Sequence, residues 1–179
     1  MLVALLGCHE NSEKAPEPPK IVEVRDDHSA TLARIQAGLP CRATFAGSEL
    51  LVDAKPSLES AGAKWSAEDR GRDVAILKDG QLFARVVRQA QEQRSGRIDV
   101  FDPKGIAMVR VSEAGGRVHV ANAGGVPLRE GQRGNPVTIG NTTVSGIDDA
   151  QLAALIAAPE LAPEVRALVA CTALRREGA

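Results

Sequence analysis

A series of short apolar runs, separated by turn sequences, occupies the chain from Cys41 to Val144. The runs alternate apolar and polar residues, which is typical of strands with one buried face. Two runs flank the turn Lys78-Asp79-Gly80-Gln81, and Asp-Gly between apolar runs is a strong hairpin signal. Two more flank Asp102-Pro103-Lys104-Gly105, where Pro and Gly occupy the positions they prefer in a type I turn. The pattern predicts an antiparallel β meander, arranged as a barrel or a sandwich.

The same rules predict a short strand at 21–24 and about ten strands in the meander. The strands of the meander cover residues 49–52, 64–66, 74–77, 82–87, 98–101, 106–111, 118–120, 126–128, 137–139 and 142–144. One segment before the meander differs. Ser29-Ala30-Thr31 can cap a helix whose residues Leu32, Ile35 and Leu39 share a face, and Pro40 would end it. We therefore expect a short amphipathic helix there.

The last segment reads as two helices. Asp148 and Asp149 precede an apolar stretch with Leu152, and a second helix starts at Pro163-Glu164, with Pro and an acid in its first turn. Arg166 is the only charge between Glu164 and Arg175. A helix that is apolar on nearly all sides should be buried on nearly all sides. The predicted fold class is α+β, mainly an antiparallel β meander with C-terminal hydrophobic helices.

The start of the chain carries a different signal. Leu2 to Leu6 are apolar, and they are followed by Gly7 and Cys8. Leu5-Leu6-Gly7-Cys8 resembles the lipobox of bacterial lipoproteins, in which the cysteine receives lipid such as palmitate after cleavage just before it. No basic residue precedes Cys8, although signal peptides usually begin with one. The alternative is a buried N-terminal strand with a free thiol at Cys8.

The residues after Cys8 favour the lipoprotein. The segment HENSEKAPEPPK (residues 9–20) is polar and rich in Pro, a composition typical of an extended, unfolded spacer. We expect a signal-peptide remnant at 1–7, a lipidated Cys8 with a flexible tether at 8–27, and one β-rich domain at 28–179. The resemblance implies a cell-envelope location, and His9 after the cysteine favours the outer membrane, facing the periplasm or the surface.

Two cysteines remain beside Cys8. In an exported protein Cys41 and Cys171 would meet oxidising conditions, where a pair can form a disulfide. The alternative is two buried free thiols. CxxC pairs and Cys/His clusters are absent from the sequence, so we expect no metal site and no cofactor.

Composition argues against several function classes. The net charge is −1, which gives no overall attraction to nucleic acid. Residues 64–133 hold thirteen bases and nine acids, a mild basic bias that suits either solvated strand edges or an anionic surface. The chain has no Tyr, three Phe and one Trp, few of the aromatic faces on which bases or sugars stack. No nucleophile, acid and base can be named together, and His119 is expected to be a solvated strand residue, so we predict no enzyme.

The hairpins and the last helix also carry a weak resemblance. "LKDGQLFARV", "VFDPKG…VRV" and "LAPEVRALVACTAL" together resemble the tubby-like barrel family, which includes LURP-one-related proteins and phospholipid scramblases. That resemblance implies a closed antiparallel barrel around a central hydrophobic helix.

Two functions are expected from these observations. The first is a membrane-anchored, non-enzymatic binding or assembly module with an envelope protein as partner. The alternative is a protein of tubby-like fold that binds a lipid or small hydrophobic ligand, for which a lumen filled by the C-terminal helix would leave no internal cavity.

Overall fold

The computed structural model describes residues 18–90 and 96–177. They form one antiparallel sheet of fourteen strands and two helices. The strands are β1 (Ile21–Asp26), β2 (Thr31–Gln36), β3 (Cys41–Phe45), β4 (Ser48–Val52), β5 (Ser57–Ser60), β6 (Ala63–Asp69), β7 (Asp73–Lys78), β8 (Gln81–Ala90), β9 (Gly96–Phe101), β10 (Ala107–Ala114), β11 (Arg117–Asn122), β12 (Pro127–Gln132), β13 (Val137–Ile139) and β14 (Thr142–Ser145). The helices are α1 (Ala150–Ile156) and α2 (Pro163–Glu177).

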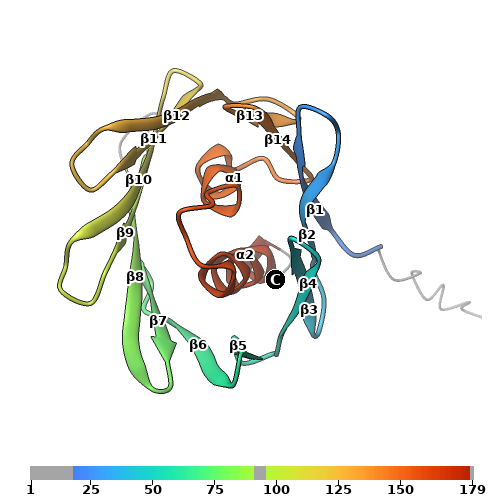
Figure 1. Ribbon diagram of the computed structural model, residues 1–179, viewed down its shortest axis with the longest axis vertical. Coiled ribbons are helices and arrows are strands. Elements are labelled where there is room, and N and C mark those ends of the chain that lie inside the picture. Colours follow the sequence, from blue (N-terminus) through green and yellow to red (C-terminus); the bar gives the residue numbers. More distant parts are fainter. Residues whose placement is uncertain (1–17, 91–95, 178–179) are drawn as a thin grey trace, which may run out of the picture.

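The sheet curls into a nearly closed barrel with both helices inside it (Figure 1). Consecutive strands pair with one another, and β1 pairs with β14, where Val24 lies opposite Val144. The edge strands are β4 and β5, which follow each other in the chain, and the Asp53 amide donates to the Ser57 carbonyl at 3.0 Å across their junction. The predicted fold class is confirmed, and of the two arrangements the structure adopts the barrel.

Two expectations near the start of the domain are wrong. The folded domain begins at Ile21 rather than at residue 28, because β1 pairs with both β2 and β14 and buries Val22 and Val24. The segment expected to be a helix is strand β2. Ala33 and Ile35 are buried while Leu32 is exposed, a period of two in which Leu32 and Ile35 lie on opposite faces.

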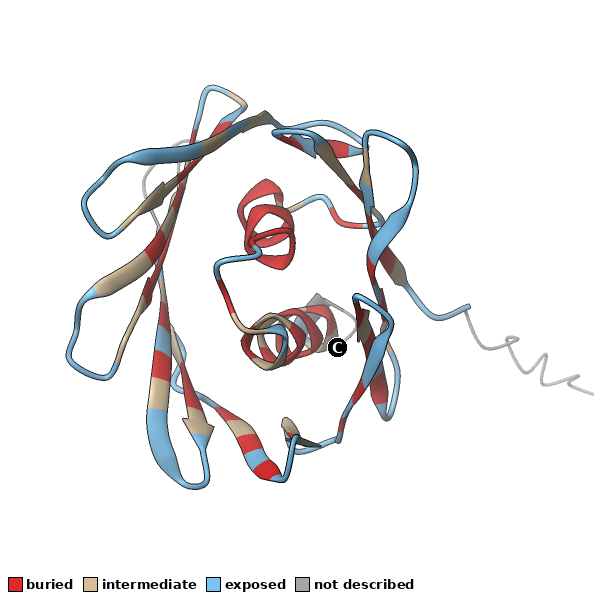
Figure 2. Ribbon diagram, viewed as in Figure 1, coloured by how far each residue is buried: buried red, intermediate tan, exposed pale blue. Residues whose placement is uncertain are grey.

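The lumen is filled by the helices. Inward-facing residues alternate with exposed ones along the strands (Figure 2), and all seven residues of α1 are buried. Alanine is frequent where helices meet the wall, as at Ala43, Ala84, Ala153 and Ala170, each at 0% exposure. Because these side chains are short, the backbones can approach closely enough for two helices to fit inside one barrel.

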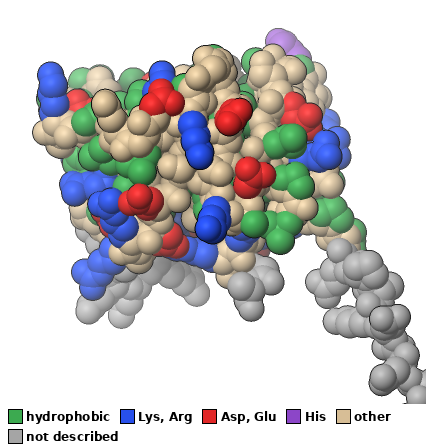
Figure 3. Space-filling model, turned by 90° about the horizontal axis from the view of Figure 1, so that it is seen from below, with side chains coloured by type: hydrophobic (Ala, Val, Ile, Leu, Met, Phe, Trp, Pro, Cys, Tyr) green, Lys and Arg blue, Asp and Glu red, His purple; other side chains and the backbone are tan. Residues whose placement is uncertain are grey.

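The alternating direction of the strands gives the barrel two ends. The entry end is where Lys20 leads into β1, and it carries the connections 37–40, 53–56, 70–72, 115–116, 133–136 and 146–149. The far end carries the connections 27–30, 46–47, 61–62, 79–80, 102–106, 123–126 and 140–141, together with the α1–α2 connection 157–162. In the side view of Figure 3 the entry end is at the bottom.

Gly146 lies where the chain leaves the wall for the lumen. Its φ is +81°, and a Cβ there would collide with the Ile21 carbonyl oxygen. We expect Gly146→Ala to lower the free energy of unfolding by about 2–3 kcal/mol, the sum of backbone strain and steric overlap. Gly125→Ala is the control in urea denaturation, because Gly125 also has a positive φ but no atom near the added Cβ. Equal losses in the two variants would contradict the steric argument.

Candidate functional site

The residues predicted as sites lie in different parts of the chain. Cys8 lies outside the described residues. Cys41 on β3 and Cys171 on α2 form a disulfide with an S–S distance of 2.01 Å and a Cα–Cα distance of 6.0 Å. Both are buried, so this bond joins the wall of the barrel to the helix in its lumen.

His119 and Asp99 both project from the outside of the barrel. His119 is partly exposed on β11, with its Nδ1 at 3.7 Å from an oxygen of Glu130, which fits the expected strand histidine.

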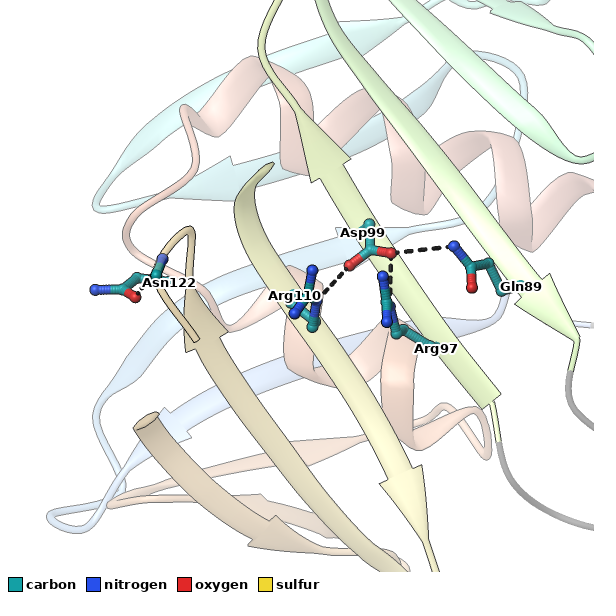
Figure 4. Close-up of polar contacts among 6 residues, drawn as sticks. Gln89, Arg97, Asp99, Arg110 and Asn122 are labelled. Atoms are coloured by element: carbon teal, nitrogen blue, oxygen red, sulfur yellow. Dashed lines mark hydrogen bonds and ion pairs between the residues drawn. The ribbon is translucent and has the colours of Figure 1, made fainter. Parts of the chain in front are cut away.

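Asp99 is fully buried although it faces outward, because side chains of the neighbouring strands cover it. Arg97 and Arg110 donate to its two oxygens at 2.6 and 2.9 Å, and Gln89 donates at 3.3 Å (Figure 4). The strong donors to both oxygens identify Asp99 as a structural anchor of β8, β9 and β10. This cluster was not predicted from the sequence. Its signal was Asp99 as the lone acid of an apolar strand, with Arg97 two residues before it on the same face.

A large hollow lies at the far end of the barrel. It has a volume of about 680 Å³ and lies between the β1–β2 and β13–β14 hairpins, the start of β12 and the α1–α2 connection. Its walls are mostly apolar, with Val24, Leu32, Leu128 and Ile139 among them. Pockets of about 300–1,000 Å³ with apolar walls and a few polar groups are typical of small-molecule sites.

Two arginines line this hollow, Arg129 on β12 and Arg166 on α2. Arg129 donates to a Glu160 oxygen at 2.5 Å. The Arg166 side chain makes one hydrogen bond within the described residues, a donation to the Ile156 carbonyl at 3.3 Å. The Nε atoms of both arginines are buried and lack a hydrogen-bond partner within the described residues.

Arg166 is therefore a half-buried cation with spare donors. Its guanidinium lies over the ring of Phe45, with 4.3 Å to the centroid, and stacking uses the face of the group while its N–H donors point outward along the edge. Burial lowers the pKa of Arg166 from its usual value, and the carboxylates of Glu160 and Glu164 oppose that shift. Within residues 18–90 and 96–177 no carboxylate lies within ion-pair distance of Arg166.

Large apolar side chains are exposed at the far end, between charged turn residues. Of the seven such side chains among the described residues, five lie at this end, namely Leu32, Leu82, Ile106, Val126 and Leu128. The sequence singled out Arg166 as the lone charge of an apolar helix but did not show what it faces. Nothing in the sequence pointed to Arg129 as a lining residue. Its place in the hollow depends on the start of β12 meeting the α1–α2 connection, and this contact is set by the tertiary structure.

Comparison with known proteins adds no relative. No model of a known protein family matches the chain, and neither the curated proteins nor the solved structures contain a significant match. Membership of the tubby-like family stays a prediction.

In the part of the chain that the structure describes, no helix is long and apolar enough to cross a bilayer, and no three His, Cys, Asp or Glu side chains are grouped to hold a metal ion. The function must therefore be argued from the structure itself, a helix-filled barrel with an arginine-lined hollow at one end.

Proposed function

We propose that this protein is a lipid-tethered, non-enzymatic binding module of the bacterial envelope, and that its ligand is a small anionic amphiphile held at the far end. The observation that carries the proposal is Arg166, a half-buried arginine that has no ion pair with a carboxylate of the described residues and that lines a mostly apolar hollow of about 680 Å³. An apolar body with a carboxylate head would bury its tail against the walls and accept hydrogen bonds from the spare donors.

The place of this hollow differs from the one that the sequence suggested. A ligand in the centre of the barrel is not what we propose, because α1 and α2 fill the lumen. The far-end hollow is instead open to the outside, at the end opposite Lys20. A tether that holds the entry end toward the membrane would leave the far end accessible. Binding of an envelope protein stays a prediction.

Octanoate is a suitable probe for the far-end hollow, with octanol as its neutral counterpart. We expect Arg166→Gln to weaken octanoate binding by about tenfold or more, as expected for lost hydrogen bonds to a charged group, and to leave octanol binding unchanged. Isothermal titration calorimetry measures both affinities.

Arg34→Gln is the matched control, because Arg34 is an exposed arginine of β2, whose residue Leu32 lines the hollow. It should bind octanoate as the unaltered chain does. No octanoate binding by the unaltered chain, or equal affinity of Arg166→Gln, would overturn the proposed ligand class.

The tether is tested separately, by growing the source bacterium with labelled palmitate. The chain should carry the label and fractionate with membranes, whereas Cys8→Ser should lose both properties. Label retained by Cys8→Ser would show that lipid is attached elsewhere, and an unlabelled chain would refute the lipoprotein assignment without affecting the far-end hollow.

A further inference from the structure

A second pocket lies at the opposite end of the barrel, with no residue in common with the far-end hollow. It has a volume of about 170 Å³ and opens at the entry end between β7, β8 and the two helices. Val74, Val86, Leu155 and Val169 form apolar walls. In Figure 3, Lys and Arg side chains lie together with Asp and Glu side chains on the lower left part of the molecule, toward this end.

Thr172 gives this pocket an unusual feature. The residue is only 8% exposed, and its Oγ1 is buried and has no hydrogen-bond partner within the described residues. A helical threonine commonly bonds the carbonyl of the preceding turn, but this one does not. A buried hydroxyl without a partner is destabilising. Other atoms of Thr172 face the pocket while its Oγ1 is turned away from it, so rotation about the χ1 bond would turn the hydroxyl toward an acceptor bound there and remove that cost.

The pocket is also short of negative charge. Three arginines line it, Arg72, Arg88 and Arg176. Arg88 donates to an Asp149 oxygen at 2.6 Å, and Arg176 is paired with Asp69. Arg72, in the β6–β7 connection, has no ion pair in the described part of the chain. One positive charge of the pocket lining therefore has no compensating carboxylate among the described residues, which suits a monoanion.

The volume limits the size of the ligand. An apolar cavity of about 150 Å³ holds a molecule the size of benzene, so this pocket has room for one ring or a short alkyl chain. We propose that the entry end binds a small aryl or short-chain carboxylate. Its apolar body lies between Val86 and the helices, and its carboxylate faces Arg72 and accepts a hydrogen bond from the Thr172 hydroxyl once that side chain has rotated toward the pocket. The proposal is independent of the far-end ligand, because the two pockets share no residue.

Benzoate, benzyl alcohol and inorganic phosphate separate the apolar and anionic requirements. Each is titrated at constant ionic strength into the disulfide-bonded full chain carrying Cys8→Ser, with binding followed by amide chemical shifts in NMR spectra. We expect saturable shifts with benzoate at residues lining the pocket. Benzyl alcohol should bind about tenfold more weakly because it lacks the charge, and phosphate should cause no saturable shifts because it lacks the apolar body.

Two variants test the named residues. Thr172→Val keeps the shape of the side chain and should weaken benzoate binding about fivefold, while the protein stays at least as stable because no buried hydroxyl is left unpaired. Arg72→Gln should weaken it about tenfold. Arg70→Gln is the control, because Arg70 lies in the same connection but is paired with Glu68. Absence of benzoate binding, unchanged affinity in Thr172→Val, or phosphate binding as tight as benzoate would each overturn the proposal.

Discussion

Replacement of both Cys41 and Cys171 by Ala is expected to lower the free energy of unfolding by about 5 kcal/mol. The bond closes a loop with a sequence separation of 130, and in the chain-entropy model a long loop gives a large effect because the unfolded chain is strongly constrained. Such a loss is a large fraction of the roughly 5–15 kcal/mol that stabilises a domain.

Urea denaturation, in a Cys8→Ser background throughout, measures this loss. The protein that keeps Cys41 and Cys171 should lose stability when reductant is added. The stability of the double Ala variant should not change with reductant. A difference below about 1 kcal/mol between the oxidised protein and the double variant would contradict the loop argument.

The position of the bond also predicts where the protein opens first. Arg175, close to Cys171 on α2, donates to the carbonyls of Val52 and Ala54 at 2.8 Å each. The disulfide and Arg175 together hold α2 against the sheet edge at β4. We therefore expect amide hydrogen exchange in the double variant to accelerate in β3, β4 and α2 more than in β9 to β11.

Replacement of Asp99 by Asn is expected to cost about 3 kcal/mol, at the lower end of the range for breaking a buried ion pair. Asp99 is fully buried, while Arg97 and Arg110 are each about one-third exposed, so solvent moderates the repulsion between the two arginines that remain. Thermal or urea unfolding measures the loss.

Glu130→Gln is the matched control for Asp99→Asn. Glu130 is also an acid of the outer wall near a basic partner, but its side chain is 71% exposed, so its loss should change stability by less than about 0.5 kcal/mol. Simultaneous replacement of Asp99, Arg97 and Arg110 by apolar residues should recover much of the stability, because no charge is then left without its partner. A triple variant as unstable as Asp99→Asn would show that the cluster acts through its shape rather than its charge.

The sequence by itself determined most of the wall. The hairpins at Asp79-Gly80 and at Asp102 to Gly105 form as predicted, because turn chemistry and period-two alternation act over a few residues. The two C-terminal helices were also predicted, since their apolar character does not depend on distant partners. In contrast, β2 was mistaken for a helix because Leu32 and Ile35 fit helical spacing, and only pairing with β1 and β3 selects the strand.

Only the tertiary structure decided how the sheet closes and what its ends present. Pairing of β1 with β14 brings the two ends of the meander together, which no local pattern encodes. That closure places Arg129 and Arg166 in the lining of one hollow and Thr172 and Arg72 in the lining of another. The physical reason is that a strand pattern fixes which side of the wall a residue faces, whereas the neighbours of that residue depend on contacts between segments far apart in the chain.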